Sequence, residues 1–255
     1  MCLILVALHQ HPSYKLILAA NRDEYYERPS TPPAFWSEAP EILAGRDLKS
    51  GGTWLGITKK GRIAAVTNYR DPASVKSNAP SRGWLVRDFL LDAGGPEEYL
   101  SRIRQEGNRY SGFNLVVGVR DDLYWYSNRT EKIVKLSRGV HGVSNRLLDT
   151  PWPKVVRGKR GISEILRRND EVSPDSLLDV LQDRTQAPEE LLPDTGVGIE
   201  WERILSPVFI VSPAYGTRSS TLVFIDKRDR VTLIDRTFNA HPQPISSEFN
   251  FTLKP

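Results

Sequence analysis

The chain begins MCLILVALHQHPSYKLILAANRDE (residues 1–24), and this stretch decides the fold. Two apolar segments, 2–9 and 14–21, flank a short turn that contains a proline. Segments of this kind on either side of a turn predict a β-hairpin. Because both segments are apolar at nearly every position, the hairpin is expected to be covered on both faces.

The only cysteine among the 255 residues lies directly after Met1. Removal of Met1 would make Cys2 the first residue, with a thiol and a free α-amine on the same residue. A free α-amine has a pKa of about 8, so it can act as the base for the thiol beside it. The alternative is that Cys2 simply begins a buried strand, since cysteine is among the most buried residue types.

The second strand of the hairpin ends in Asn21, Arg22, Asp23 and Glu24. A two-stranded pairing returns these polar residues to the start of the chain, close to Cys2. An arginine beside a cysteine favours the thiolate, and a carboxylate can orient the arginine or the amine. An ordinary ion pair at a solvated hairpin end is the alternative interpretation.

The rest of the chain repeats short strands joined by turns, and two groups of helices interrupt them. Two long segments rich in proline, 27–40 and 187–200, are interpreted as loops. The predicted strands are 53–58, 62–68, 113–120, 123–128, 132–137, 217–226 and 230–238, and the predicted helices are 81–94, 96–107, 150–170 and 173–184. Gly61 suits a hairpin turn before Arg62, and Ser81 is a typical N-cap residue for the first helix.

This order of elements predicts the fold class. Strands that are apolar on both faces need a cover, and helices on the outer faces of two stacked sheets provide it. The sequence therefore predicts an α+β fold, a four-layer αββα sandwich, in one domain over residues 1–255.

Composition excludes several classes of function. Lys and Arg total 35 against 31 for Asp and Glu, and the arginines are scattered among acids, which disfavours nucleic-acid binding. One cysteine excludes an internal disulfide, and the four histidines have no metal-ligand spacing, so neither a metal nor a cofactor is expected. The opening apolar segment is too short for a transmembrane segment and is not a signal peptide, so a cytoplasmic protein is expected.

Several longer blocks resemble the NRDE family, which includes the transport and Golgi organisation 2 proteins. Members are linked to Golgi organisation, secretion, haem trafficking and acyl-CoA or lipid metabolism. The resemblance implies a small amphipathic or anionic ligand such as an acyl amide, haem or acyl-CoA. The blocks are NRDE after an N-terminal MC, GGTWLGIT (51–58), AAVTNYRDP (64–72), GFNLVVG (112–118), HGVSNRLLDTPWPKV (141–155) and GTRSSTLVFID (216–226).

A more distant resemblance links the chain to choloylglycine hydrolases and penicillin V acylases, which are N-terminal nucleophile hydrolases with an αββα sandwich. Cys2 is similar to their nucleophile, Asn68 and Asn145 resemble their two asparagines, and Arg218 resembles their late arginine. The resemblance implies that the asparagines stabilise an oxyanion. Ordinary turn or helix-cap chemistry is the alternative for both asparagines.

The expected function is that of a cysteine amidohydrolase acting on the C–N bond of a small acyl amide. The alternative is a non-catalytic carrier or chaperone for haem, acyl-CoA or a related amphipathic metabolite, and the oligomeric state stays open. The expected catalytic residues are Cys2, Arg22, Asp23, Asn68, Asn145 and Arg218, and the expected substrate-binding residues are Asn21, Glu24, Trp54, Thr217 and Ser219.

Overall fold

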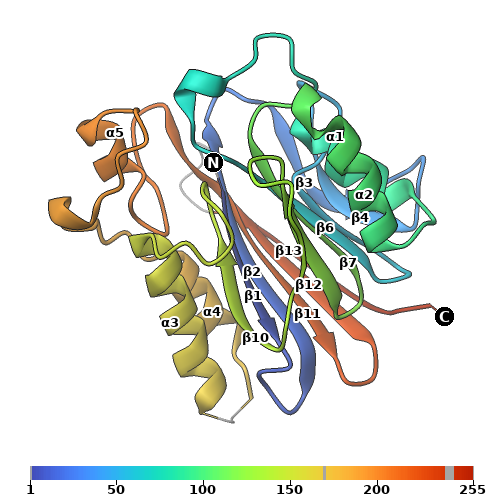
Figure 1. The fold of residues 1–255 in the computed structure, drawn as a ribbon. Coiled ribbons are helices and arrows are strands. Elements are labelled where there is room, and N and C mark those ends of the chain that lie inside the picture. The colour runs from blue at the N-terminus through green and yellow to red at the C-terminus, as the bar shows by residue number, and fades with distance from the viewer. Residues whose placement is uncertain (1, 169–170, 239–243, 255) are drawn as a thin grey trace.

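The computed structural model describes residues 2–168, 171–238 and 244–254. Met1 and the last two residues of the predicted helix 150–170 lie outside the described residues. The described chain forms two sheets stacked face to face with helices on their outer sides (Figure 1). The predicted four-layer αββα sandwich is confirmed.

The first sheet has six strands and contains the N-terminal hairpin. Its order is β10-β1-β2-β11-β12-β13, and each neighbouring pair is antiparallel. The bounds are β1 Cys2–Leu8, β2 Tyr14–Tyr25, β10 Gly139–Val143, β11 Tyr215–Asp226, β12 Arg230–Thr237 and β13 Ile245–Thr252.

The second sheet has seven strands in the order of the chain, again with antiparallel neighbours. The predicted hairpin turn before Arg62 is present, and Gly61 adopts φ 80° there. The bounds are β3 Ser30–Phe35, β4 Ile42–Asp47, β5 Leu55–Thr58, β6 Arg62–Asn68, β7 Phe113–Val119, β8 Asp122–Ser127 and β9 Ile133–Lys135.

Two helices cover each sheet. α3 (Pro153–Arg167) and α4 (Pro174–Leu181) pack on the six-stranded sheet, and α1 (Arg82–Leu91) and α2 (Pro96–Glu106) pack on the seven-stranded sheet. Ser81 caps α1 as its sequence predicts, because its hydroxyl oxygen accepts a hydrogen bond from the Gly83 N–H. Among the described residues, no helix is both long and apolar enough to cross a bilayer.

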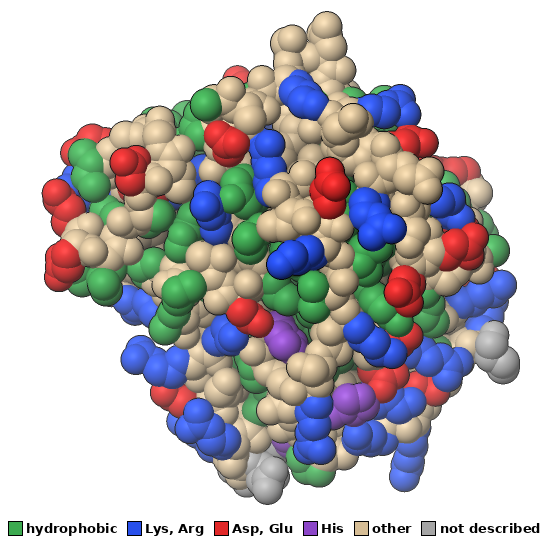
Figure 2. Space-filling view, viewed as in Figure 1, with side chains coloured by type: hydrophobic (Ala, Val, Ile, Leu, Met, Phe, Trp, Pro, Cys, Tyr) green, Lys and Arg blue, Asp and Glu red, His purple; other side chains and the backbone are tan. Residues whose placement is uncertain are grey.

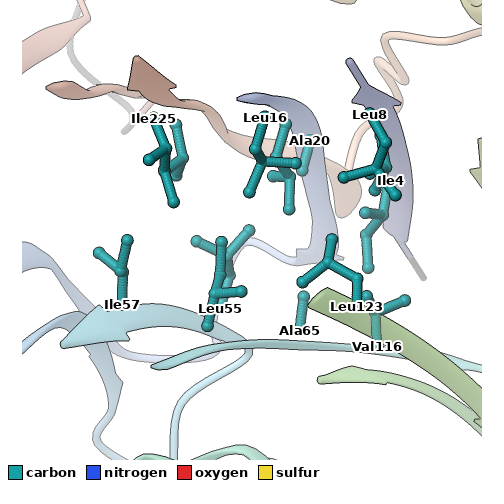
Figure 3. Close-up of a cluster of buried hydrophobic side chains, with 14 of the residues drawn as sticks. Ile4, Leu8, Leu16, Ala20, Leu55, Ile57, Ala65, Val116, Leu123 and Ile225 are labelled. Carbon is teal, nitrogen blue, oxygen red and sulfur yellow. The ribbon is translucent and has the colours of Figure 1, made fainter. Parts of the chain in front are cut away.

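Alternation along β1 explains its continuous apolar sequence. Ile4, Val6 and Leu8 pack into the core between the sheets, whereas Leu3 and Leu5 pack against the helices. Figure 3 shows the core between the two sheets, where aliphatic side chains of the two sheets face one another. The N-terminal hairpin is therefore buried on both faces, as predicted.

A close approach between α3 and β1 depends on one glycine. A Cβ atom added to Gly158 would lie 2.6 Å from a methyl carbon of Leu5. The glycine therefore lets α3 lie directly on the sheet. This contact matters below, because the first turn of α3 carries a side chain that reaches the end of β2.

The loop predicted over 27–40 is wrong, whereas most of the loop predicted over 187–200 has no regular structure. Segment 27–40 contains β3, an edge strand whose register with β4 is interrupted between Thr31 and Ala34, where Pro32 and Pro33 lack an N–H. Segment 187–200 contains a 3₁₀ turn and the start of the short helix α5 (Ile199–Ile204). A strand at the edge of a sheet tolerates proline, because its outward-facing N–H groups have no partner strand to bond.

Figure 2 shows how charge is distributed on one face of the molecule. Lys and Arg side chains are interspersed there with Asp and Glu side chains. On this face the small positive net charge is therefore not gathered into a single basic patch.

Candidate functional site

The motif at residues 21–24 lies within β2 and divides between the two faces of the sheet. Successive side chains of a strand point to opposite sides. Arg22 and Glu24 share the cavity face with Cys2, which is paired directly with Arg22 in the register of β1 and β2. Asn21 and Asp23 direct their side chains toward the helix layer.

A cavity of about 340 Å³ lies between the sheets at the end where β1 begins. Its size falls in the range typical of small-molecule sites. The six-stranded sheet contributes one wall, and the seven-stranded sheet and the first turn of α1 contribute the other. The residues that carry the chemistry of the lining are Cys2, Arg22, Glu24, Arg28, Asp47, Trp54, Asn68, Arg82, Arg218, Ser219, Thr221 and Asp235.

Cys2 lines this cavity with only 8% of its surface exposed. Burial raises the pKa of its thiol, and the Asp23 carboxylate adds to the increase. The Asp23 backbone N–H and the Arg22 guanidinium act in the opposite direction on this pKa. The thiol therefore needs a base before it can react as a nucleophile.

Arg22 is buried beside Cys2 with 8% of its surface exposed. Its Nη1 atom is inaccessible to solvent and has no hydrogen-bond partner among the described residues. An unpaired buried donor costs about 1–3 kcal/mol of stability. Within the part of the chain that the structure describes, this guanidinium nitrogen therefore keeps an unused donor.

On the opposite face, Asp23 forms a buried pair with Lys154 of α3. The Asp23 Oδ1 accepts a hydrogen bond of 2.7 Å from the Thr217 hydroxyl, and its Oδ2 lies 3.7 Å from the Lys154 Nζ. Burial raises the pKa of the Asp23 carboxyl and lowers the pKa of the Lys154 ammonium, while their mutual attraction opposes both shifts. The two charges depend on each other.

Lys154 was not predicted from the sequence, although the pattern of α3 contains a signal for it. Lys154, Gly158, Ile162 and Leu166 recur at a spacing of four and form one buried stripe of α3. A lysine in that stripe, with 1% of its surface exposed, is unusual. Its place in the first turn is also unfavourable for a cation because of the helix dipole. Helical periodicity therefore marks Lys154 as a residue that needs a partner.

A second buried pair lies next to the first. The Arg70 Nη1 contacts the Glu202 Oε2 of α5, and the Arg70 guanidinium lies 4.7 Å from the ring centroid of Trp152. The Glu202 Oε1 accepts a hydrogen bond of 3.0 Å from the Thr195 N–H. This ion pair connects α5 to the loop that follows β6, the strand that ends at Asn68.

The two asparagines have different surroundings. Asn68 lines the cavity at the end of β6. Asn145 is fully buried, and its Nδ2 donates a hydrogen bond of 2.8 Å to the Asn68 carbonyl oxygen. The neighbouring Ser144 hydroxyl donates to the Cys2 carbonyl oxygen at 2.9 Å. The 144–145 segment thus holds both the start of β1 and the end of β6.

Arg218 lies in a bulge of β11, where the register with β2 shifts between Thr217 and Ser219. Its Nη1 donates to the carbonyl oxygens of Tyr25, Tyr26 and Arg28, at 2.9, 3.2 and 3.0 Å. Arg218 therefore clamps the turn that follows β2, besides lining the cavity.

The structure brings most of the expected site residues together but not all. Asn21 is the clearest exception, because its Nδ2 donates to the carbonyl oxygens of Leu181 and Val208 in the helix layer. Its position does not support substrate binding. The expected residues that line the cavity are Cys2, Arg22, Asp23, Glu24, Trp54, Asn68, Arg218 and Ser219, although the Asp23 carboxylate pairs with Lys154 on the helix face. The expected residues that do not line it are Asn21, Thr217 and Asn145.

Solved structures with a similar fold are N-terminal nucleophile hydrolases. A C2A mutant of the conjugated bile acid hydrolase from Clostridium perfringens is 9% identical and aligns with a TM-score of 0.56, covering 100% of this chain and 97% of its own. Penicillin V acylase from Agrobacterium tumefaciens is 12% identical with a TM-score of 0.51, covering 98% and 86%. At these identities the likeness describes the fold alone.

Relatives in sequence are much closer. The human transport and Golgi organization protein 2 homolog is 39% identical, with 93% of both chains covered, and the bovine homolog is 37% identical over the same shares. The Drosophila melanogaster protein is 29% identical. The family model described as transport and Golgi organisation 2 matches residues 1–240. This chain therefore belongs to the transport and Golgi organisation 2 family.

Proposed function

We propose that the chain is a cysteine amidohydrolase that cleaves the C–N bond of a small acyl amide at Cys2. The observation that carries the proposal is the position of Cys2 at the start of β1, inside a cavity of small-molecule size and beside the buried Arg22. The proteins that share the fold include one named a bile acid hydrolase and one named a penicillin acylase, in keeping with amide chemistry.

The proposed reaction needs Cys2 as the first residue of the mature chain. Its neutral α-amine accepts the thiol proton, and the sulfur attacks the acyl carbonyl carbon to form a C–S bond and an oxyanion. When the oxyanion collapses, the C–N bond breaks and the leaving amine receives the proton from the α-ammonium. A water molecule then attacks the thioester carbonyl carbon and gives a proton to the α-amine. The C–S bond breaks, the sulfur takes this proton from the α-ammonium, and the acid is released.

The other residues receive roles that follow from their contacts. Arg22 lowers the pKa of the thiol, and Asp23, held by Lys154, orients the α-amine. Asn68 is the proposed oxyanion donor from the cavity wall, a contribution worth about 3 kcal/mol in other enzymes. Asn145 is a positioning residue, because its amide nitrogen is already bonded to the Asn68 carbonyl oxygen.

A carrier role for an amphipathic ligand is the second candidate, and one observation favours it. Burial raises the pKa of the Cys2 thiol, which opposes a resting nucleophile. In this role the cavity would hold part of an acyl-CoA or haem molecule, since its volume lies near the lower end of the range for ligand sites. Cys2 would then be only a wall residue.

The test compares the wild type with Cys2→Ser and Cys2→Ala on a panel of N-acyl amides, after mass analysis of the N-terminus. If the proposal holds, Met1 is removed, the wild type releases free amine, and both variants lose at least about 1,000-fold in kcat. A retained Met1, or a panel without turnover by the wild type, contradicts it. Unchanged haem or acyl-CoA binding by Cys2→Ala would then support the carrier role.

A further inference from the structure

The loop that follows β10, residues 144–149, contacts both sheets beside Cys2. The Ser144 hydroxyl donates to the Cys2 carbonyl oxygen, and the Ser144 carbonyl oxygen accepts a hydrogen bond from the Thr67 hydroxyl. The Asn145 amide nitrogen donates to the Asn68 carbonyl oxygen. The 144–149 loop therefore connects the first residue of β1 with the last two residues of β6.

Asp149 closes this loop at its base. Its backbone N–H donates to the Gly142 carbonyl oxygen at 2.7 Å, and its Oδ1 accepts a hydrogen bond of 2.9 Å from the Gly142 N–H. Asp149 adopts φ 55°, in the left-handed region that residues other than glycine seldom occupy. Residues in this region persist where their contacts hold them, and they cluster at functional sites. The contacts of Asp149 therefore decide whether the loop stays closed.

Side chains from a strand and from a helix meet at the Asp149 carboxylate. Its Oδ1 accepts a hydrogen bond of 2.5 Å from the Lys159 Nζ of α3, and its Oδ2 lies 2.8 Å from the His141 Nδ1 of β10. All three side chains are partly exposed, so solvent reaches the group. The carboxylate therefore joins the 144–149 loop to the edge strand of the six-stranded sheet and to the helix that covers it.

Both nitrogen atoms of the His141 ring face hydrogen-bond acceptors. The Nδ1 faces the Asp149 carboxylate, and the Nε2 lies 2.9 Å from the Ser137 carbonyl oxygen. A neutral imidazole has one N–H, whereas the imidazolium has two. Only the protonated ring can therefore donate to both oxygens at once, and loss of its proton removes one of these two hydrogen bonds.

The surroundings of His141 give the direction of its pH dependence. The hydrogen bond to Asp149 raises the pKa of His141, and burial and the Lys159 ammonium oppose the increase. The partner strand β1 places Val6, which does not titrate, opposite His141. A histidine whose pKa is higher in the folded state stabilises the fold fully below its unfolded value of about 6.5. This contribution disappears as the pH rises through the raised pKa.

We propose that His141 and Asp149 are positioning residues for Cys2 and Asn68, because the protonated His141 ring holds Asp149 and so keeps the 144–149 loop closed against both sheets. The inference rests on the proposed function only in taking Cys2 as the reactive group. It adds a form of regulation, since the surroundings of Cys2 are ordered when His141 is charged and loosen when it loses its proton.

Because Cys2 is the only cysteine, alkylation tests this role without any substrate. Iodoacetamide forms a C–S bond with the thiolate, and iodide leaves with the electron pair of the C–I bond. The measurement is the rate constant for Cys2 across a pH series, corrected for titration of the thiol, in wild type, His141→Gln and Asp149→Asn. Asparagine tolerates the left-handed backbone and keeps an acceptor for the Gly142 N–H, so Asp149→Asn mainly removes the charge.

The matched control is His9→Gln. The His9 Nε2 lies 3.0 Å from the Asp121 Oδ2, so this variant removes a comparable histidine–aspartate contact at the turn of the N-terminal hairpin, outside the 144–149 loop. It separates the position of His141 from the general loss of such a pair.

At about pH 6 we expect the corrected rate constant to rise roughly tenfold in His141→Gln and Asp149→Asn, as for the loss of one charge-assisted hydrogen bond, and to stay unchanged in His9→Gln. The wild type should approach the two variants as the pH rises. Coincident profiles of wild type and His141→Gln would overturn the proposal, even if His141→Gln lowers Tm, because a purely structural ion pair changes Tm alone. Alkylation needs no turnover, so this failure is distinct from that of the amidohydrolase proposal.

Hydrogen exchange at Arg70 decides the question if Cys2 does not react. The Arg70 backbone N–H donates to the Asn145 carbonyl oxygen at 2.8 Å and so reports closure of the 144–149 loop. At about pH 6 its protection should fall roughly tenfold in His141→Gln and remain at the wild-type level in His9→Gln. Equal protection in wild type and His141→Gln would refute the positioning role whatever the reactivity of Cys2.

Discussion

The two faces of the six-stranded sheet differ sharply at the end where β1 begins. On the helix face, Asp23 is matched by Lys154 and Thr217, and the Asn21 amide nitrogen is bonded to two carbonyl oxygens. On the cavity face, the Arg22 Nη1 has no hydrogen-bond partner among the described residues. The motif at residues 21–24 therefore stabilises the fold on the helix face and leaves a hydrogen-bond donor for a ligand on the cavity face.

The largest expected effect is the loss of one partner of the buried Asp23–Lys154 pair. Asp23→Asn leaves the Lys154 ammonium without its counter-charge, so we expect the free energy of unfolding to fall by about 3–5 kcal/mol. Urea denaturation measures the change. The control is the double variant Asp23→Asn/Lys154→Met, which should recover much of the loss; a single variant as stable as wild type would mean that the helix face is not a structural unit.

The second effect concerns Asp235, a cavity-face carboxyl that accepts hydrogen bonds from the hydroxyl groups of Thr221 and Thr237. Burial raises the pKa of Asp235 to about 6. A carboxyl whose pKa is higher in the folded state than in the unfolded state stabilises the fold below the unfolded value of about 4, and this contribution disappears as the pH rises through about 6. Relative to Asp235→Asn, the wild type should therefore lose up to about 3 kcal/mol of unfolding free energy between pH 4 and 6.

Unfolding curves at several pH values check this prediction. The expected sign is a wild-type stability that declines across this window while the stability of Asp235→Asn declines less. Parallel profiles for the two proteins would show that the Asp235 carboxyl ionises in the folded protein as easily as in the unfolded chain.

The smallest expected effect is at Arg22. Because its Nη1 is buried and unpaired, Arg22→Met should leave the free energy of unfolding unchanged or raise it by up to about 1 kcal/mol. Thermal melts of the wild type and of Arg22→Met measure the change, and a clear loss of stability would place Arg22 with the structural residues of the other face.

Local patterns predicted much of this architecture. The turn before Arg62, the Ser81 cap and the apolar hairpin at the start of the chain each depend on residues close in sequence, and the structure contains all three. The edge strand β3 was missed because Pro32 and Pro33 argue against a strand wherever an N–H is needed. An edge position removes part of that need.

Most residues expected at the site line one cavity, but the two-sided arrangement of the 21–24 motif was not predicted. The hairpin pairing predicted that Arg22 and Asp23 lie near Cys2. The pleat of β2 directs their side chains to opposite faces of the sheet. Lys154 was missed because its partner lies far away in the sequence, and only the contact of α3 with β1 brings the two together. Long-range pairing of this kind has no local signal.

The strand order has a consequence for how the chain matures during synthesis. β2 pairs with β11, and the buried hydrogen bond between Ser220 and Asn21 joins positions 199 residues apart. Contacts between such distant segments form late, since the second partner must first be translated and the loop then closed. The wall around Cys2 therefore cannot assemble until the ribosome has made most of the protein, so the nascent chain carries a cysteine that has no cavity around it.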